Sequence, residues 1–76
     1  MKLKLTRHFQ YRMSQRGIDI DHVKQAVVRP DTTEKTYDNK IIARRKIGEK
    51  TIEVIYCKEG FKDKKDEYLL ITAYYL

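Results

Sequence analysis

The chain has 76 residues, and its 17 lysines and arginines exceed its 11 aspartates and glutamates, which gives a formal charge of +6. This length provides one hydrophobic core, so we expect residues 1–76 to form a single domain. The 37% of charged residues and the lack of an apolar run of about 18 residues exclude a membrane-spanning helix. The first residues lack the apolar stretch of a signal peptide, and a lone cysteine excludes an internal disulfide. We therefore expect a soluble cytoplasmic protein without a membrane partner. The positive excess is typical of proteins that bind polyanions.

Two short helices joined by a tight glycine turn are predicted in the first part of the chain. Thr6 is suited to cap a helix that runs to Arg16, because its hydroxyl can accept a hydrogen bond from a first-turn N–H. Gly17 supplies the left-handed residue that ends this helix. Asp19 caps a second helix with apolar residues at helical spacing, and Pro30 closes it because the residue before a proline disfavours the helical region.

The rest of the chain is predicted to form strands. Residues 32–38 are polar and β-prone, residues 40–47 predict a strand, and residues 51–58 alternate clearly between two faces. Residues 59–67 form a charged loop, and residues 67–75 predict the most apolar strand, which we place centrally. The predicted fold class is therefore α+β, with two N-terminal helices packed on one face of a three- to four-stranded antiparallel sheet.

The last predicted strand is rich in tyrosine. Strict alternation places four residues on one face, namely Tyr68, Leu70, Thr72 and Tyr74. A tyrosine there can stack on a nucleobase or donate a hydrogen bond to a phosphate. The alternative is that these tyrosines serve the strand and the rim of the core, where tyrosine is a common residue.

A polar cluster occupies the first predicted helix. His8 and Arg12 are one turn apart, Arg16 is a further turn along, and Gln15 falls on the same side. Histidine can exchange a proton near neutral pH, and guanidinium groups can hold the charge that builds on phosphorus, so the set is suited to gripping or cleaving a phosphodiester. The alternative is a solvated helix face whose arginines pair with Glu53 or with an acidic residue of the second helix.

A basic run, Arg44-Arg45-Lys46, lies inside the strand predicted over residues 40–47. Alternation places Arg44 and Lys46 on one face and Arg45 on the other. Two cations side by side on a sheet can contact phosphates, and the alternative is that they protect an edge strand from aggregation.

Metal and cofactor motifs are missing from the sequence. The two histidines and the cysteine, His8, His22 and Cys57, have no paired ligand spacing. No glycine-rich phosphate loop and no hydrolase motif of the G-x-S-x-G or H-E-x-x-H type occurs. We therefore expect neither a metal nor a cofactor.

Two segments resemble a family of small uncharacterised bacterial domains. They are residues 8–18, which read HFQYRMSQRGI, and residues 70–74, which read LITAY. The family signature is H-x-x-x-R-M-x-x-R-G-I on the first helix and an I-x-T-x-Y-like last strand. The family is similar to RelE/ParE-type toxins and, more broadly, to the fold shared by barnase, EndoU, the colicin RNases and RelE. The resemblance covers nearly the whole chain and implies a RelE-like fold.

The resemblance also implies an activity, a metal-independent RNA endonuclease of a toxin–antitoxin system in which the ribose 2′-OH attacks the adjacent phosphorus. The implied catalytic residues are His8 as acid or base, Arg12 and Arg16 as phosphate stabilisers, and Tyr74 at the C-terminal end. The implied RNA-binding residues are Gln15, Arg44, Arg45, Lys46 and Thr72. The implied partners are RNA, either free or on the ribosome, and an antitoxin protein.

One departure from such toxins, and the diversity of their relatives, keep other functions open. RelE-type toxins usually lack a helix histidine, so His8 points to catalysis of the colicin or EndoU style, or to a structural role. ParE relatives keep the fold but act on gyrase, so the fold does not decide the function. The alternatives are a non-catalytic module that binds nucleic acid or protein through the same surface, and a toxin that acts on a protein target.

Overall fold

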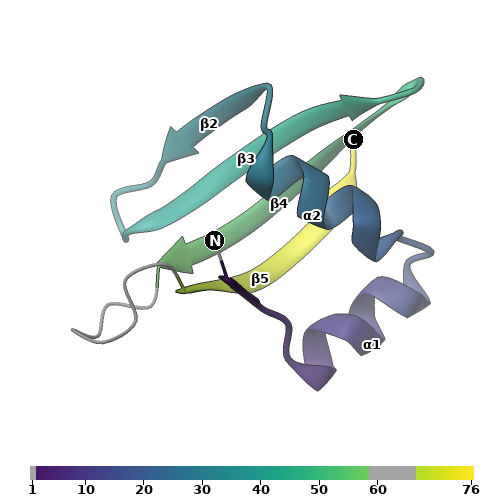
Figure 1. Ribbon diagram of the computed structural model, residues 1–76, viewed down its shortest axis with the longest axis horizontal. Coiled ribbons are helices and arrows are strands. Elements are labelled where there is room, and N and C mark those ends of the chain that lie inside the picture. The colour runs from purple at the N-terminus through teal and green to yellow at the C-terminus, as the bar shows by residue number, and fades with distance from the viewer. Residues whose placement is uncertain (1, 59–66) are drawn as a thin grey trace.

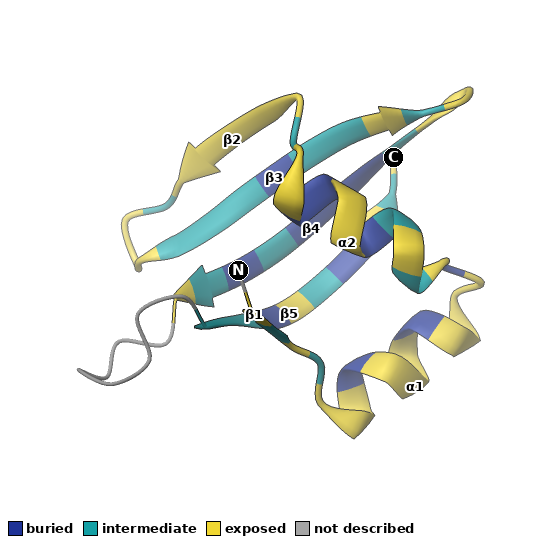
Figure 2. Ribbon diagram, in the orientation of Figure 1, coloured by how far each residue is buried: buried dark blue, intermediate teal, exposed yellow. Residues whose placement is uncertain are grey.

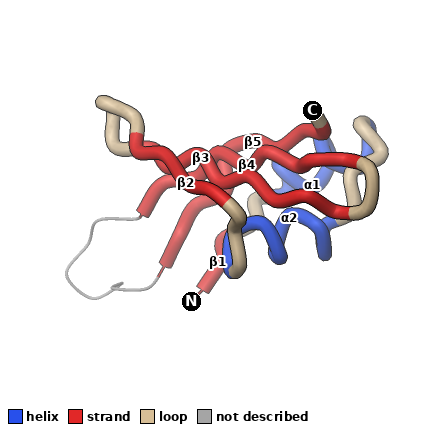
Figure 3. Tube along the Cα trace, turned by 90° about the horizontal axis from the view of Figure 1, so that it is seen from above, coloured by secondary structure: helices blue, strands red, loops and turns tan. Residues whose placement is uncertain are grey.

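The computed structural model describes residues 2–58 and 67–76. In chain order its elements are β1 (Lys2–Lys4), α1 (Arg7–Gln15), α2 (Ile20–Val28), β2 (Thr32–Lys35), β3 (Lys40–Ile47), β4 (Lys50–Lys58) and β5 (Glu67–Tyr75). The strands form one sheet in the order β1-β5-β4-β3-β2. Figure 1 shows α2 crossing over the sheet and α1 lying beside β5, and Figure 3 shows α2 on one side of the sheet. The α+β class and the helical pair that precedes the main sheet strands are confirmed.

The predicted count and direction of the strands are wrong. The described chain has five strands rather than three or four, and β1 pairs in parallel with β5, with Leu3 beside Tyr68. The three residues of β1 are too few to give an alternating signal, and their pairing partner lies at the other end of the chain. The prediction that residues 67–75 form the central strand is also wrong, because β4 has two strands on each side and β5 lies between β4 and the short edge strand β1. Residues 59–66 of the predicted charged loop lie outside the described residues.

The helix ends follow the predicted capping residues. Thr6 Oγ1 accepts a hydrogen bond from the Phe9 backbone N–H at 3.1 Å, and Asp19 Oδ1 accepts one from the Asp21 N–H at 2.8 Å. Gly17 has a φ of +65°, the left-handed conformation that glycine adopts most easily. These local bonds explain why α1 begins and ends where the sequence predicts.

Removing the N-terminal cap of α1 tests whether the Thr6 hydroxyl stabilises this helix. Replacing Thr6 with alanine is expected to lower the free energy of unfolding by about 1 kcal/mol, because the Phe9 N–H loses its acceptor. Chemical denaturation measures the change. Ser14→Ala in the same helix is the control and should cost nothing, since no side-chain capping bond involves Ser14 in the described chain. Equal stability of Thr6→Ala and the unmodified protein would contradict the capping assignment.

The hydrophobic core lies between the two helices and one face of the sheet. Figure 2 shows buried residues in both helices and in β3, β4 and β5. Its largest fully buried side chains are Met13, Ile52, Val23, Val27 and Val54. They come from α1, α2 and β4, and α2 packs against β3 and β4 whereas α1 packs against β5.

The last strand departs from strict alternation. Leu70 and Thr72 pair with consecutive residues of β4, so Ile71 is an extra residue in a β-bulge. Leu70 and Ala73 are consequently both buried toward the helices although they are three residues apart. The prediction that Leu70 shares a face with Thr72 and Tyr74 is therefore wrong, because the bulge moves the later residues to the opposite face. An apolar run such as this one gives no sign of where a bulge falls.

Candidate nucleic-acid interface

The sheet face opposite α2 gathers polar residues from three strands. In cross-strand register, Arg44 of β3 lies beside Glu53 of β4, and Glu53 lies beside Tyr74 of β5. In the adjacent row, Ile42 and Thr72 flank the same residue of β4. We call the surface formed by these residues the outer face.

Glu53 is the centre of the outer face. The residue is only 6% exposed, and it is the one buried charged residue in the part of the chain that the structure describes. Glu53 Oε1 accepts a hydrogen bond from Arg44 Nε at 2.6 Å, and Oε2 accepts one from the Tyr74 hydroxyl. Arg44 Nη1 also lies 3.8 Å from Glu34 Oε1 on β2. One carboxylate therefore fixes both an arginine and a tyrosine on this face.

The contacts of Glu53 shift three protonation equilibria. Burial raises the pKa of Glu53, but hydrogen bonds from Tyr74 and Arg44 outweigh it, so the pKa lies below its ordinary value. The hydrogen bond to Glu53, together with burial, raises the pKa of Tyr74. The same carboxylate raises the pKa of Arg44. Glu53 is thus a poor proton acceptor at neutral pH, and its chemistry suits it to holding its two partners in place.

Arg16 joins α1 to the outer face. Its Nη1 donates hydrogen bonds to Thr72 Oγ1 and to the Ala73 carbonyl, each at 3.0 Å. Strand β1 pairs with β5 from Glu67 to Leu69. The Ala73 carbonyl therefore lies on the part of this β5 edge that no described strand covers. Two predicted site residues far apart in the sequence, Arg16 and Thr72, are therefore in direct contact, and Tyr74 follows on the same face as Thr72.

The other predicted residues of α1 make no hydrogen bond or ion pair with the described strands. His8 and Arg12 are exposed, and within residues 2–58 and 67–76 neither side chain makes a hydrogen bond or ion pair. Gln15 donates to the Tyr11 hydroxyl at 2.9 Å, so its amide is engaged within the helix. Arg16 is the member of the predicted helix cluster that the fold brings to β5.

The basic run of β3 is divided between the two faces, as alternation predicts. Arg44 lies on the outer face, and the Lys46 side chain, which is exposed, falls on the same side. Arg45 lies on the helix side, where its Nη1 donates to the Arg29 carbonyl at 2.7 Å and stands 3.9 Å from Asp31. Arg45 therefore does not share a surface with Arg44.

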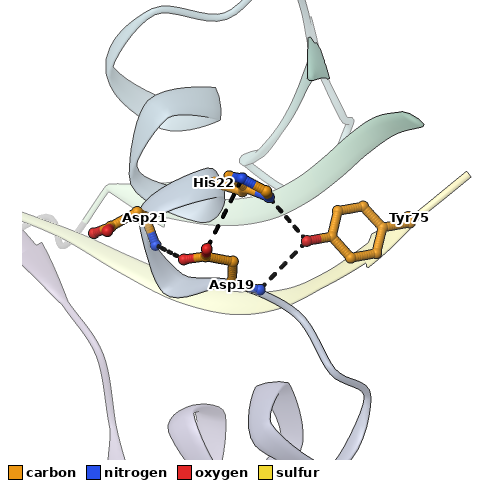
Figure 4. A network of polar contacts seen from close by, with 4 residues as sticks. All are labelled: Asp19, Asp21, His22 and Tyr75. Carbon is orange, nitrogen blue, oxygen red and sulfur yellow. Dashed lines mark hydrogen bonds and ion pairs between the residues drawn. The ribbon is translucent and has the colours of Figure 1, made fainter. Parts of the chain in front are cut away.

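A second polar network links the start of α2 to the end of β5 (Figure 4). His22 Nδ1 lies 3.0 Å from the Tyr75 hydroxyl, which also accepts a hydrogen bond from the Asp19 backbone N–H at 3.3 Å. His22 Nε2 lies 3.9 Å from Asp19 Oδ2. Lys50 Nζ sits 5.0 Å from the centre of the Tyr75 ring. The Tyr75 hydroxyl contacts both Asp19 and His22, so the network connects the start of α2 to the end of β5.

Comparison with known families decides which group the chain belongs to. A family model described as a domain of unknown function, DUF4258, matches residues 5–75. The chain belongs to the DUF4258 family. The DUF4258 match covers both helices and β2 to β5, so every predicted site residue lies inside it. No curated protein and no solved structure matches the chain. The match confirms a family of small domains, and the relation to RelE-type toxins stays a prediction.

Glu53 is the residue of this DUF4258 domain that sequence reasoning did not assign to the site. The signal was present, since an acidic residue stands alone in an alternating apolar strand and faces a basic run. Only the register between strands shows that it meets both Arg44 and Tyr74.

In the described segments, no group of three histidine, cysteine or acidic side chains could hold a metal ion. None of the described helices is long and apolar enough to span a membrane.

Proposed function

We propose that the chain is a RelE-like, metal-independent RNA endonuclease that acts as the toxin of a toxin–antitoxin system. The observation that carries the proposal is the contact of Arg16 with Thr72, 3.0 Å long, beside the Arg44–Glu53–Tyr74 row. This contact connects α1, which carries His8 and Arg12 and ends at Arg16, to the sheet face that carries Arg44 and Tyr74. RNA would bind along this junction.

The proposed reaction uses the residues of α1 on the phosphate. The ribose 2′-OH attacks the adjacent phosphorus, the bond to the 5′-oxygen breaks, and a cyclic phosphate forms. His8 takes the proton of the 2′-OH and returns a proton to the leaving 5′-oxygen. Arg16 uses its Nη1 group to bond Thr72 and the Ala73 carbonyl, and its other N–H groups can donate to the phosphate oxygens. Arg12, one turn earlier, faces the same side and adds a second cation.

The outer face supplies binding rather than proton transfer in this proposal. The charge of Arg44 is balanced by Glu53, so Arg44 serves as a fixed hydrogen-bond donor for the backbone of RNA. Tyr74 is 36% exposed, and its ring offers a surface on which a base can stack. Glu53 acts through these two residues and is a positioning residue.

A second candidate function, a module that binds RNA without cleaving it, is favoured by one observation. Both carboxylate oxygens of Glu53 are engaged and its pKa is lowered, so Glu53 is not available as a general base on the outer face. Catalysis then depends on His8 alone, which has no partner that would orient it among the described residues. If His8 is only a surface residue, the same cations bind RNA and leave it intact.

Cleavage of RNA in the presence of EDTA separates the two functions. The unmodified protein should cut the RNA, and His8→Ala and Arg12→Ala should lower the rate by about 10²-fold or more while RNA binding is retained. Arg7→Ala, an exposed arginine of the same helix, is the matched control. Intact RNA with every protein would contradict the endonuclease and support the binding module. Ribosome-bound RNA is included as a second substrate, because some toxins of this type cut only there.

Binding itself should depend steeply on salt. Each lysine or arginine that contacts a phosphate releases counterions, so the logarithm of the affinity should fall linearly with the logarithm of salt concentration. Fluorescence anisotropy of a labelled RNA at several salt concentrations measures the slope, and Arg44→Gln should make it shallower. A salt-independent affinity would contradict binding through phosphates and favour a protein target.

A further inference from the structure

A basic pocket lies between α2 and β3, away from the outer face. It encloses about 310 Å³ and is lined by Lys24, Gln25, Val28, Arg29 and Arg45. Three of these five residues are cations. The nearby acidic group, Asp31, lies 3.9 Å from Arg45 and offsets only part of this charge. The pocket therefore favours a negatively charged ligand.

Arg45 is the anchored cation of this pocket. Its Nη1 donates to the Arg29 carbonyl at 2.7 Å, which holds the guanidinium under the end of α2. Its Nε is buried and has no hydrogen-bond partner, unlike any other buried side-chain nitrogen or oxygen in the described residues. A buried donor without an acceptor costs free energy, and this cost falls on the same guanidinium that lines the pocket.

Val28 adds an apolar contact to the three cations. Its side chain is 55% exposed although it stands in a helix that buries its other valines. It lies beside Arg29 and one turn after Lys24. A ligand that fills the pocket must therefore combine negative charge with an apolar group.

We propose that this pocket binds an acidic, apolar segment of a partner protein. Carboxylates of the segment would meet Lys24, Arg29 and Arg45, and an aliphatic side chain would cover Val28. A nucleic acid fits less well, because no aromatic ring lines the pocket for a base to stack on. The pocket is on the helix side of the sheet, so the proposal is independent of RNA cleavage and allows a partner to bind together with RNA.

A labelled synthetic peptide tests the proposal by fluorescence anisotropy. The probe repeats Glu-Glu-Leu-Ser, and two matched peptides replace either the glutamates with glutamine or the leucines with serine. The double variant Lys24→Glu, Arg29→Glu should bind the probe about tenfold more weakly or worse. Val28→Ser should weaken binding of the leucine-containing probe and leave binding of the serine peptide unchanged.

A second double variant, Lys35→Glu with Lys58→Glu, is the control, because it makes the same change in charge outside the pocket. It should bind the probe as the unmodified protein does. Equal weakening by both double variants would overturn the proposal, since net charge alone would explain it. Failure of the unmodified protein to bind the probe would overturn it as well. An RNA oligonucleotide whose binding depends on Lys24 and Arg29, with no such dependence for the peptide, would assign the pocket to nucleic acid instead.

Discussion

Replacing Glu53 with alanine is expected to lower the free energy of unfolding by about 3 kcal/mol, the low end of the range for breaking a buried ion pair. The substitution leaves Arg44 and the Tyr74 hydroxyl without their acceptor in the middle strand of the sheet. The loss is at the low end because the Arg44 side chain is 35% exposed, so water solvates part of its charge. Urea denaturation at neutral pH measures the change.

The control for this substitution is Glu34, a second acidic residue whose carboxylate lies near Arg44. Glu34 lies 3.8 Å from Arg44, and its side chain is 61% exposed. Glu34→Ala should leave the stability nearly unchanged, since exposed ion pairs contribute little. Similar stabilities of the two alanine variants would show that the buried carboxylate does not hold the outer face together.

The contribution of Glu53 should also depend on pH. The folded pKa of Glu53 is lowered from its ordinary value of 4.5, so folding favours the ionised carboxylate. This stabilisation is present above the ordinary pKa and is lost as the pH falls through the lower, folded pKa. The stability difference between the unmodified protein and Glu53→Gln should therefore shrink as the pH is lowered from neutral toward about 3. A difference that stays constant over this range in urea denaturation would contradict the assignment.

The second large effect is expected at Arg16. Arg16→Ala should lower the rate of RNA cleavage by about 10²- to 10³-fold, because the guanidinium that would hold the phosphate is lost. Arg16→Lys should recover only part of the rate, since an ammonium lacks the planar fork of five donors with which a guanidinium can bond Thr72 and the Ala73 carbonyl and still present N–H groups to a phosphate. Cleavage is measured at saturating RNA, and circular dichroism checks the fold of each variant.

Two comparisons keep the Arg16 prediction specific. Arg7→Ala removes another exposed arginine of α1 and should leave cleavage unchanged. Thr72→Val removes one acceptor of Arg16 but keeps its charge, and it should lower the rate less than Arg16→Ala does. Wild-type cleavage by a folded Arg16→Ala protein would remove Arg16 from the proposed reaction.

The parts of the fold that follow from the sequence are those set by neighbouring residues. The caps at Thr6 and Asp19 and the left-handed Gly17 act within one turn, so the ends of the helices could be predicted. The bounds of β3 could be predicted because alternation between two turns fixes them. The short strand β1 and the bulge at Ile71 could not, because each depends on a pairing partner that is distant in the sequence.

The candidate site divides in the same way. Arg44 and Tyr74 could each be singled out from their own strand, and Arg16 from its helix. Their connection could not, because Glu53 meets the first two through strand register, and Arg16 reaches Thr72 across 56 positions of the chain. Alternation along β3 predicted that Arg45 lies on the other face of the sheet from Arg44. Its place in a separate pocket could not be predicted, because that depends on how α2 packs on β3.

The products of RNA cleavage test the proposed function most directly. A labelled oligoribonucleotide is incubated with the protein in EDTA, next to the same oligonucleotide with 2′-deoxyribose at the cleaved position, and the ends are identified by mass spectrometry. The proposed reaction predicts a 2′,3′-cyclic phosphate on one fragment, a 5′-hydroxyl on the other, and no cleavage of the deoxy-substituted strand. Equal cleavage of both strands, or intact RNA whether free or ribosome-bound, would contradict attack by the 2′-OH and with it the proposed endonuclease.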